Sequence, residues 1–229
     1  NGILGNAGKA KEDTEISNEK EIISVAVVQA MGKNNRGNLK EDEFQEELNN
    51  QAGKEGIVEV AEAGEYFEVL FTESNRYYEV DKDGNIGEVQ EFVKDENPGD
   101  ITVGQNGEKL DGSEAHPYEI WCIEDLVKLS QMVNEENNQL TNQYVVLKKD
   151  LDFNSSLSYA DANTTEFDIY LGGDGTTPLK QQLSEEGKGF EPIGKPMTAA
   201  NVFEANFDGE NHIIRNIYIN KSGGAALFG

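Results

Sequence analysis

The chain has 229 residues, with 44 Asp and Glu against 19 Lys and Arg, which gives a formal net charge of −25. A surface this acidic repels nucleic-acid phosphates and anionic lipid headgroups, so we expect no nucleic-acid partner. Divalent cations, basic proteins and neutral glycans remain compatible with it. The length is enough for one or two domains, each with its own core.

The first fifty residues predict two helices. Over residues 4–32 apolar side chains recur at helical spacing, most densely in the second half, whereas the first half is polar and should be solvated. A shorter helix is predicted over 39–51, with Asn38 as its cap. The apolar positions of the long helix are Ile16, Ile22, Ile23, Ala26, Val27 and Ala30.

Three strands are predicted next, at 57–62, 66–73 and 76–81. Each is rich in β-forming residues and is bounded by turn residues. A tight turn at 81–85 leads into a further extended segment. Together with the long helix, these strands predict an α+β unit with an antiparallel meander.

The segment 81–92 has part of the pattern of a calcium-binding loop. Asp81, Asp83 and Asn85 occupy the first, third and fifth positions, where oxygen ligands are needed. The sixth position, which requires Gly, is Ile86, and the twelfth, which requires Glu, is Phe92. A hairpin turn therefore explains this segment better than a metal site does.

Residues 92–117 are rich in Gly, Asp, Asn and Glu, and we predict a linker there. Beyond it, a helix is predicted over 124–133 and a strand over 144–153. The polar segment 154–189, with a short helix near 179–183, is long enough to indicate an insertion that either presents a recognition surface or is decoration without a ligand.

The C-terminal segment 203–220 alternates apolar and polar residues after a turn at Asp208-Gly209. Ile213, Ile217 and Ile219 then follow at strand-like intervals. This pattern predicts one rung of a stacked β-structure that ends at an open edge.

Two parts of the chain resemble known families. The first half resembles the head of prepilin-type proteins of Gram-positive bacteria, in which the amphipathic end of a membrane-anchored helix packs on a small antiparallel sheet. This resemblance implies a pilin-like domain over 1–91, pilus subunits as partners, and membrane contact only through an N-terminal helix missing from this sequence. The matching segments are GILGNAGKAKEDTEISNEKEIISVAVVQAMG and YFEVLFTESNRYYEVDKDGNI.

The second half resembles bacterial surface proteins with GLUG-type β-solenoid repeats. The resemblance implies a mainly β, right-handed β-solenoid-like domain over 118–229, capped by the helix at 124–133 and truncated at its C-terminus. It supplies no catalytic residues, because the motifs of this family specify strands and turns. The matching segments are PYEIWCIEDLVKLSQMV, YVVLKKDLDFNSS, GKGFEPIG, FEANFDGENHIIRNIYIN and ALFG.

Few residues are candidates for a site. Asp168 and Asp174 in a Gly-rich stretch could supply oxygen ligands to calcium, although Asp and Gly are equally what a plain turn needs. Tyr159, Phe167 and Tyr170 in the insertion could stack on a sugar or dock a protein. The single cysteine, Cys122, has an apolar setting typical of a buried structural thiol.

The sequence thus predicts a non-enzymatic bacterial cell-surface or pilus-associated protein that displays a β-solenoid for adhesion. No catalytic or cofactor-binding residue is predicted, and calcium is the one candidate metal. The predicted partner is a glycan or protein on a host or neighbouring cell, and the predicted location is extracellular. The alternatives are a solenoid carbohydrate-active enzyme, a glycan-binding module and a structural spacer without a ligand.

Overall fold

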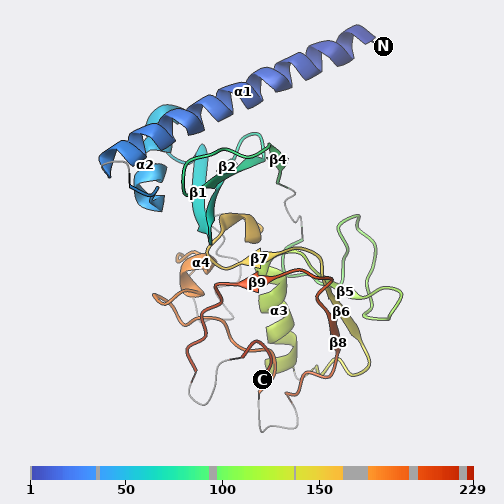
Figure 1. Cartoon of the computed structure of the whole chain (residues 1–229). Helices are drawn as coiled ribbons and strands as arrows, with labels where there is room; N and C mark the ends of the chain where they lie inside the picture. Colours follow the sequence, from blue (N-terminus) through green and yellow to red (C-terminus); the bar gives the residue numbers. More distant parts are fainter. Residues whose placement is uncertain are drawn as a thin grey trace. The chain divides into compact units, whose positions relative to one another are not determined.

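The computed structural model of the chain describes residues 2–34, 37–92, 97–136, 138–161, 175–195, 201–221 and 226–229, with side chains from Gly8 onward. The chain divides into two compact units, Asn1–Val93 (unit 1) and Lys94–Gly229 (unit 2). Figure 1 shows the elements of both.

Unit 1 is a long helix and a short helix on an antiparallel sheet. The helices are α1 (Gly2–Lys33) and α2 (Glu41–Ala52), and the sheet has the order β1-β2-β3-β4. The long helix and the antiparallel meander are those expected from the sequence, and α2 begins after Lys40 rather than after Asn38. The strands are β1 (Val58–Ala63), β2 (Tyr66–Phe71), β3 (Arg76–Asp81) and β4 (Gln90–Glu91).

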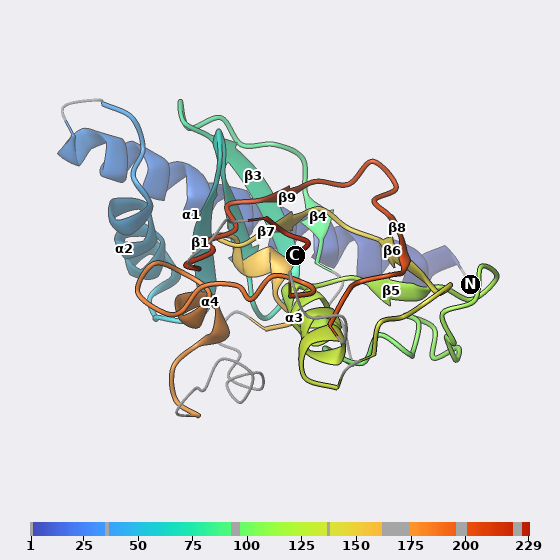
Figure 2. The same cartoon turned by 90° about the horizontal axis from the view of Figure 1, so that it is seen from below.

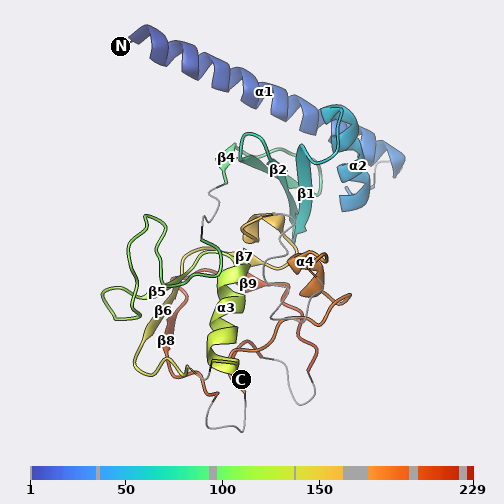
Figure 3. The ribbon, with the colours of Figure 1, turned by 180° about the vertical axis from the view of Figure 1, so that it is seen from behind.

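The core of unit 1 lies between the second half of α1, α2 and one face of the sheet. Phe44 of α2 meets Phe67 of β2 edge to face, with ring centroids 5.8 Å apart. The α1 residues that the spacing assigned to its apolar face supply the other wall; they are Ile23, Ala26, Val27 and Ala30, all at most 5% exposed. In contrast, residues 8–14 are exposed, and this half of α1 extends past the sheet (Figures 1 and 3).

The turn after β3 has the geometry of a hairpin turn. Asp81 Oδ1 accepts hydrogen bonds from the backbone N–H groups of Asp83 and Asn85, at 3.0 and 2.8 Å. Its Oδ2 accepts from the side-chain amide of Asn85. Gly84 has a φ of +85°, and a Cβ there would collide with Val27 on α1. The carboxylate of Asp81 is therefore used within the turn.

Unit 2 is built around the helix α3 (Ile123–Asn134). A three-stranded parallel sheet, β5-β6-β8, lies beside α3, and a two-stranded parallel pair, β7-β9, lies near its N-terminal end (Figures 2 and 3). The other elements of unit 2 are β5 (Tyr118–Ile120), β6 (Tyr144–Leu147), β7 (Leu151–Asp152), η1 (Ser156–Ser158), α4 (Leu179–Gln182), β8 (Asn206–Asp208) and β9 (Ile214–Arg215).

The prediction of a β-solenoid over residues 118–229 is wrong. The protein is a small α+β protein with a long helix and an antiparallel sheet, and no solenoid is found in the described part of the chain. The apolar segments after Tyr118 form strands of only two to four residues in two separate sheets. The helix predicted as a terminal cap is instead central, because Leu126, Leu129 and Val133 are completely buried.

Two other segments contribute to the core of unit 2. The predicted linker 92–117 supplies Ile101 and Leu110, which are 1% and 3% exposed. The segment 154–189, predicted as a surface insertion, supplies Leu179 and Leu183, both nearly inaccessible. These few buried apolar residues were not predicted because the segments around them are mostly polar.

Candidate functional site

Tyr159, the one residue of the predicted ligand surface that lies among the described residues, is buried. Tyr159 is 1% exposed, and its hydroxyl donates a 2.9 Å hydrogen bond to the carbonyl of Phe153. Burial, followed by the nearby carboxylates of Glu124 and Asp152, raises the pKa of Tyr159 well above its ordinary value. The other four candidates, Asp168, Asp174, Phe167 and Tyr170, lie outside the described residues.

Cys122 and the histidines show no joint site. Cys122 is 4% exposed and is the N-cap residue of α3. His212 Nδ1 lies 3.0 Å from Asp150 Oδ1, in the loop before β9. Within the described ranges, no group of three or more His, Cys, Asp or Glu side chains could hold a metal ion. Calcium binding therefore stays a prediction.

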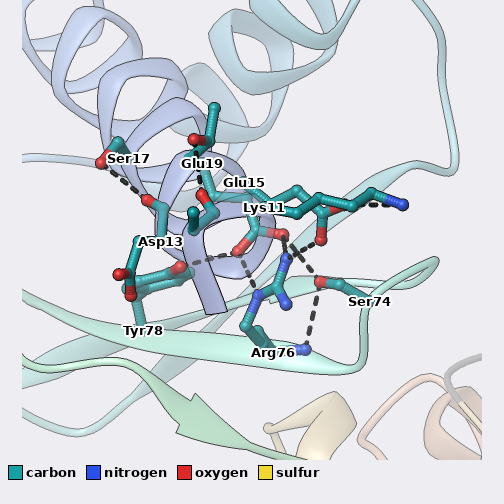
Figure 4. Close-up of polar contacts among 10 residues, drawn as sticks. Lys11, Asp13, Glu15, Ser17, Glu19, Ser74, Arg76 and Tyr78 are labelled. Atoms are coloured by element: carbon teal, nitrogen blue, oxygen red, sulfur yellow. Dashed lines mark hydrogen bonds and ion pairs between the residues drawn. The ribbon is translucent and has the colours of Figure 1, made fainter. Parts of the chain in front are cut away.

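A network of polar side chains joins α1 to the sheet of unit 1 (Figure 4). Glu19 of α1 accepts two hydrogen bonds from the Arg76 guanidinium of β3, at 2.9 and 3.0 Å. The hydroxyls of Ser74 and Tyr78 donate to the same carboxylate, at 2.7 and 2.6 Å. Arg76 also reaches Glu15, one turn earlier on α1, at 3.1 Å.

The electrostatics of this network indicate a structural role. Burial by itself raises the pKa of Glu19, but hydrogen bonds from Arg76, Tyr78 and Ser74 outweigh it and lower the pKa below its ordinary value of 4.5. Both carboxylate oxygens have two donors each, so the charged form is satisfied within the protein. The network fixes α1 on the sheet at Glu19.

This pKa shift predicts a loss of unit 1 stability in acid. Because the folded pKa of Glu19 is lowered, its contribution is present above pH 4.5 and is lost as the pH falls below that value through the folded pKa. We expect the stability difference between the wild type and Glu19→Gln to shrink from pH 7 to pH 3. Hydrogen exchange of the unit 1 strands measures the stability of each variant. A stability difference between wild type and Glu19→Gln that stays constant with pH would contradict the prediction.

Beside this network, unit 1 has a hollow of about 400 Å³. Its lining includes the acidic residues Glu15 and Glu73 and the apolar residues Ile57 and Phe71. The buried polar groups at its edge are those of the Glu19 network, which are already paired with one another. This hollow therefore offers carboxylates but no buried polar group that awaits a ligand.

A larger hollow, of about 520 Å³, lies in unit 2. We call it the Tyr218 hollow. Its apolar lining comes from Phe153, Leu183 and Ile217, and Tyr218 provides an aromatic ring. The polar residues that line it are Asn154, Ser184, Glu185, Glu186 and Asn216.

Three contacts fix the lining of the Tyr218 hollow. Gly189 has a φ of +74°, and a Cβ there would lie 2.7 Å from the Tyr218 carbonyl oxygen and 2.9 Å from its ring, so glycine permits this close approach. The backbone N–H of Phe190 donates to the same carbonyl at 2.7 Å. Asn216 donates its side-chain N–H to the buried Asp152 at 2.9 Å.

Sequence reasoning did not identify the Tyr218 hollow. The sequence pattern predicts Asn216 and Tyr218 as part of a regular strand, and Asn154 as the start of a polar insertion. The available signal was the residue type at position 216, because Asn tolerates the left-handed conformation, and Asn216 adopts it with a φ of 56°.

No known protein family, curated protein sequence or solved structure matches the chain. The pilin-like and GLUG-type resemblances therefore stay predictions. No helix in the described residues is long and apolar enough to cross a membrane.

Proposed function

We propose that the chain is a non-enzymatic bacterial cell-surface or pilus-associated protein, in which unit 1 mediates assembly and unit 2 adheres to an extracellular glycan or protein. The observation that carries this proposal is the exposed extension of α1. The arrangement of a long helix on an antiparallel sheet is the one implied by the pilin-like resemblance, and it supports the proposal.

The extension of α1 is suited to contact with another subunit. Residues 8–14 are exposed, whereas Arg76 holds the helix at Glu15 and Glu19. Helical turns without tertiary contacts are marginally stable in water, and Gly8 weakens them further. Packing against another copy would bury this segment and stabilise it.

Charge supports self-association through this segment. Lys9 and Lys11 precede Glu12 and Asp13 along the extension. If two extensions pack antiparallel, the lysines of one copy face the carboxylates of the other. The same patch thus serves both subunits of a two-fold contact.

Cysteine cross-linking tests the assembly role. Lys11 has a side chain that is 81% exposed, and the native Cys122 is buried, so Lys11→Cys introduces one accessible thiol. We expect oxidation of concentrated protein to give disulfide-linked dimers. Lys54→Cys, at an exposed position after α2, is the matched control and should remain monomeric. Equal cross-linking of both variants, or none, would refute assembly through α1.

The adhesive role is tested on the intact chain rather than by removal of the segment 154–189. Leu157, Leu179 and Leu183 in that segment are at most 4% exposed, so a deletion would unfold unit 2. Retention of the intact chain on arrayed glycans or host proteins is the direct measurement. Calcium can be added as a second variable in the same experiment.

A further inference from the structure

We propose that the Tyr218 hollow binds a neutral oligosaccharide. The inference deepens the adhesive part of the proposed function and rests on it. The hollow combines an aromatic ring, an apolar lining and several amide and carboxylate groups, which is the combination that a sugar ring requires. Its volume of about 520 Å³ lies within the range of roughly 300–1,000 Å³ found for small-molecule sites.

The apolar and aromatic part suits the face of a sugar. One face of a pyranose carries C–H groups, which pack on aromatic rings and aliphatic side chains. The Phe190 N–H holds the backbone of Tyr218, and its half-buried side chain packs closely against Gly189. Because the backbone is held and one edge of the ring is packed, less conformational entropy is lost on binding than for a fully exposed side chain.

The polar part suits hydroxyl groups. Asn216 uses a side-chain N–H on Asp152, which leaves its amide oxygen as an oriented acceptor. The side chains of Asn154 and Glu185 have no hydrogen-bond partner among the described residues and line the same hollow. Amides and carboxylates match sugar hydroxyls, because each hydroxyl both donates and accepts.

Charge selects against acidic sugars. Glu185 and Glu186 lie at the hollow, and the chain as a whole carries a charge of −25. A sialic or uronic acid would place another carboxylate beside them, and this repulsion is costly at short range. A neutral oligosaccharide avoids this cost and still satisfies the carboxylates through its hydroxyls.

The test uses the intact chain on an array of defined neutral, sialylated and uronic-acid oligosaccharides, with an oligolysine peptide as a further probe. We expect retention of neutral glycans above the others. The best neutral glycan is then titrated by calorimetry against Tyr218→Ala, Tyr218→Phe and Asn154→Ala. Tyr218→Ala should weaken binding at least tenfold and Asn154→Ala severalfold, whereas Tyr218→Phe should bind within about threefold of the wild type.

The matched control is Tyr144→Ala. Tyr144 is also half-buried, and it lines a separate groove of unit 2 that contains Glu114, Asp208 and Glu210. Glycan affinity should be unchanged in this variant. Because Asn154 is exposed, Asn154→Ala should fold normally and keeps the test decisive if Tyr218→Ala does not fold.

Three results would overturn the inference. They are the absence of neutral-glycan binding, unchanged affinity in Asn154→Ala and in folded Tyr218→Ala, and stronger binding of acidic glycans or oligolysine. Glycan binding that these variants leave intact would place the ligand elsewhere and would not affect the proposed adhesion. Failure of Lys11→Cys to cross-link concerns assembly through α1 alone.

Discussion

Arg76→Ala should destabilise unit 1 by about 3–5 kcal/mol, because it leaves the carboxylate of Glu19 buried without its charged partner. The side chains of Glu19 and Arg76 are only 10% and 11% exposed, so water compensates little for the loss. Hydrogen exchange of the slowest amides in β2 and β3 measures the change in the free energy of unfolding.

The same cluster supplies the control. Glu15 contacts the same guanidinium, but its side chain is 45% exposed. Glu15→Gln should therefore cost less than about 1 kcal/mol, as is usual for solvated ion pairs. Trp121, the one tryptophan of the sequence, belongs to unit 2, and its fluorescence should show whether unit 2 remains folded. Similar losses of unfolding free energy in Arg76→Ala and Glu15→Gln would contradict the argument that burial makes the Glu19–Arg76 pair the more important one.

Asp125→Ala is expected to destabilise unit 2 by about 2–4 kcal/mol. The carboxylate of Asp125 accepts backbone N–H bonds from Trp121, Cys122 and Gly99, at 2.8, 3.2 and 2.8 Å. Loss of a helix cap costs about 1 kcal/mol. Of the three N–H groups only that of Cys122 makes a fully buried bond, and leaving it without an acceptor adds about 1–3 kcal/mol, whereas water can reach the other two. Urea unfolding followed by Trp121 fluorescence measures the effect.

Asp125→Asn distinguishes the two contributions. Asn retains one acceptor oxygen, which can keep the bonds from the N–H groups of Trp121 and Cys122. The bond from the Gly99 N–H is then lost, because the other oxygen is replaced by an NH₂ group. Its destabilisation should fall between those of the wild type and Asp125→Ala. If Asp125→Ala unfolds at the same urea concentration as the wild type, the cap contributes nothing to unit 2.

Unit 1 could be predicted from the sequence because its signals are local. The face of α1 that includes Ile23, Val27 and Ala30 is encoded by spacing within one helix, and the meander pairs strands that follow one another directly. The Glu19 network could not be predicted. It joins residues 57 positions apart, and nothing marks Glu19 among 44 acidic residues.

Unit 2 was harder to predict because its contacts are distant in the sequence. The pairing of Leu151 with Ile214 joins two short strands across a segment of some sixty residues. The alternation after Asp208 indicated strands, yet Ile213 is 54% exposed, and the pattern carried no information on how many strands would pair. The Tyr218 hollow likewise combines Asn154 with residues far along the chain.

The contact between Gly84 and Val27 has a mechanical consequence for α1. Val27 lies eight residues beyond Glu19, or about 12 Å along the helix, so two separate points set the axial position of α1 on the sheet. If α1 slid along the sheet by one turn, the two hydrogen bonds from Arg76 to Glu19 would break, and a side chain other than Val27 would lie against the turn at Gly84. A pulling force along the axis of α1 would therefore act on both contacts at once, and both would have to break before the helix could move.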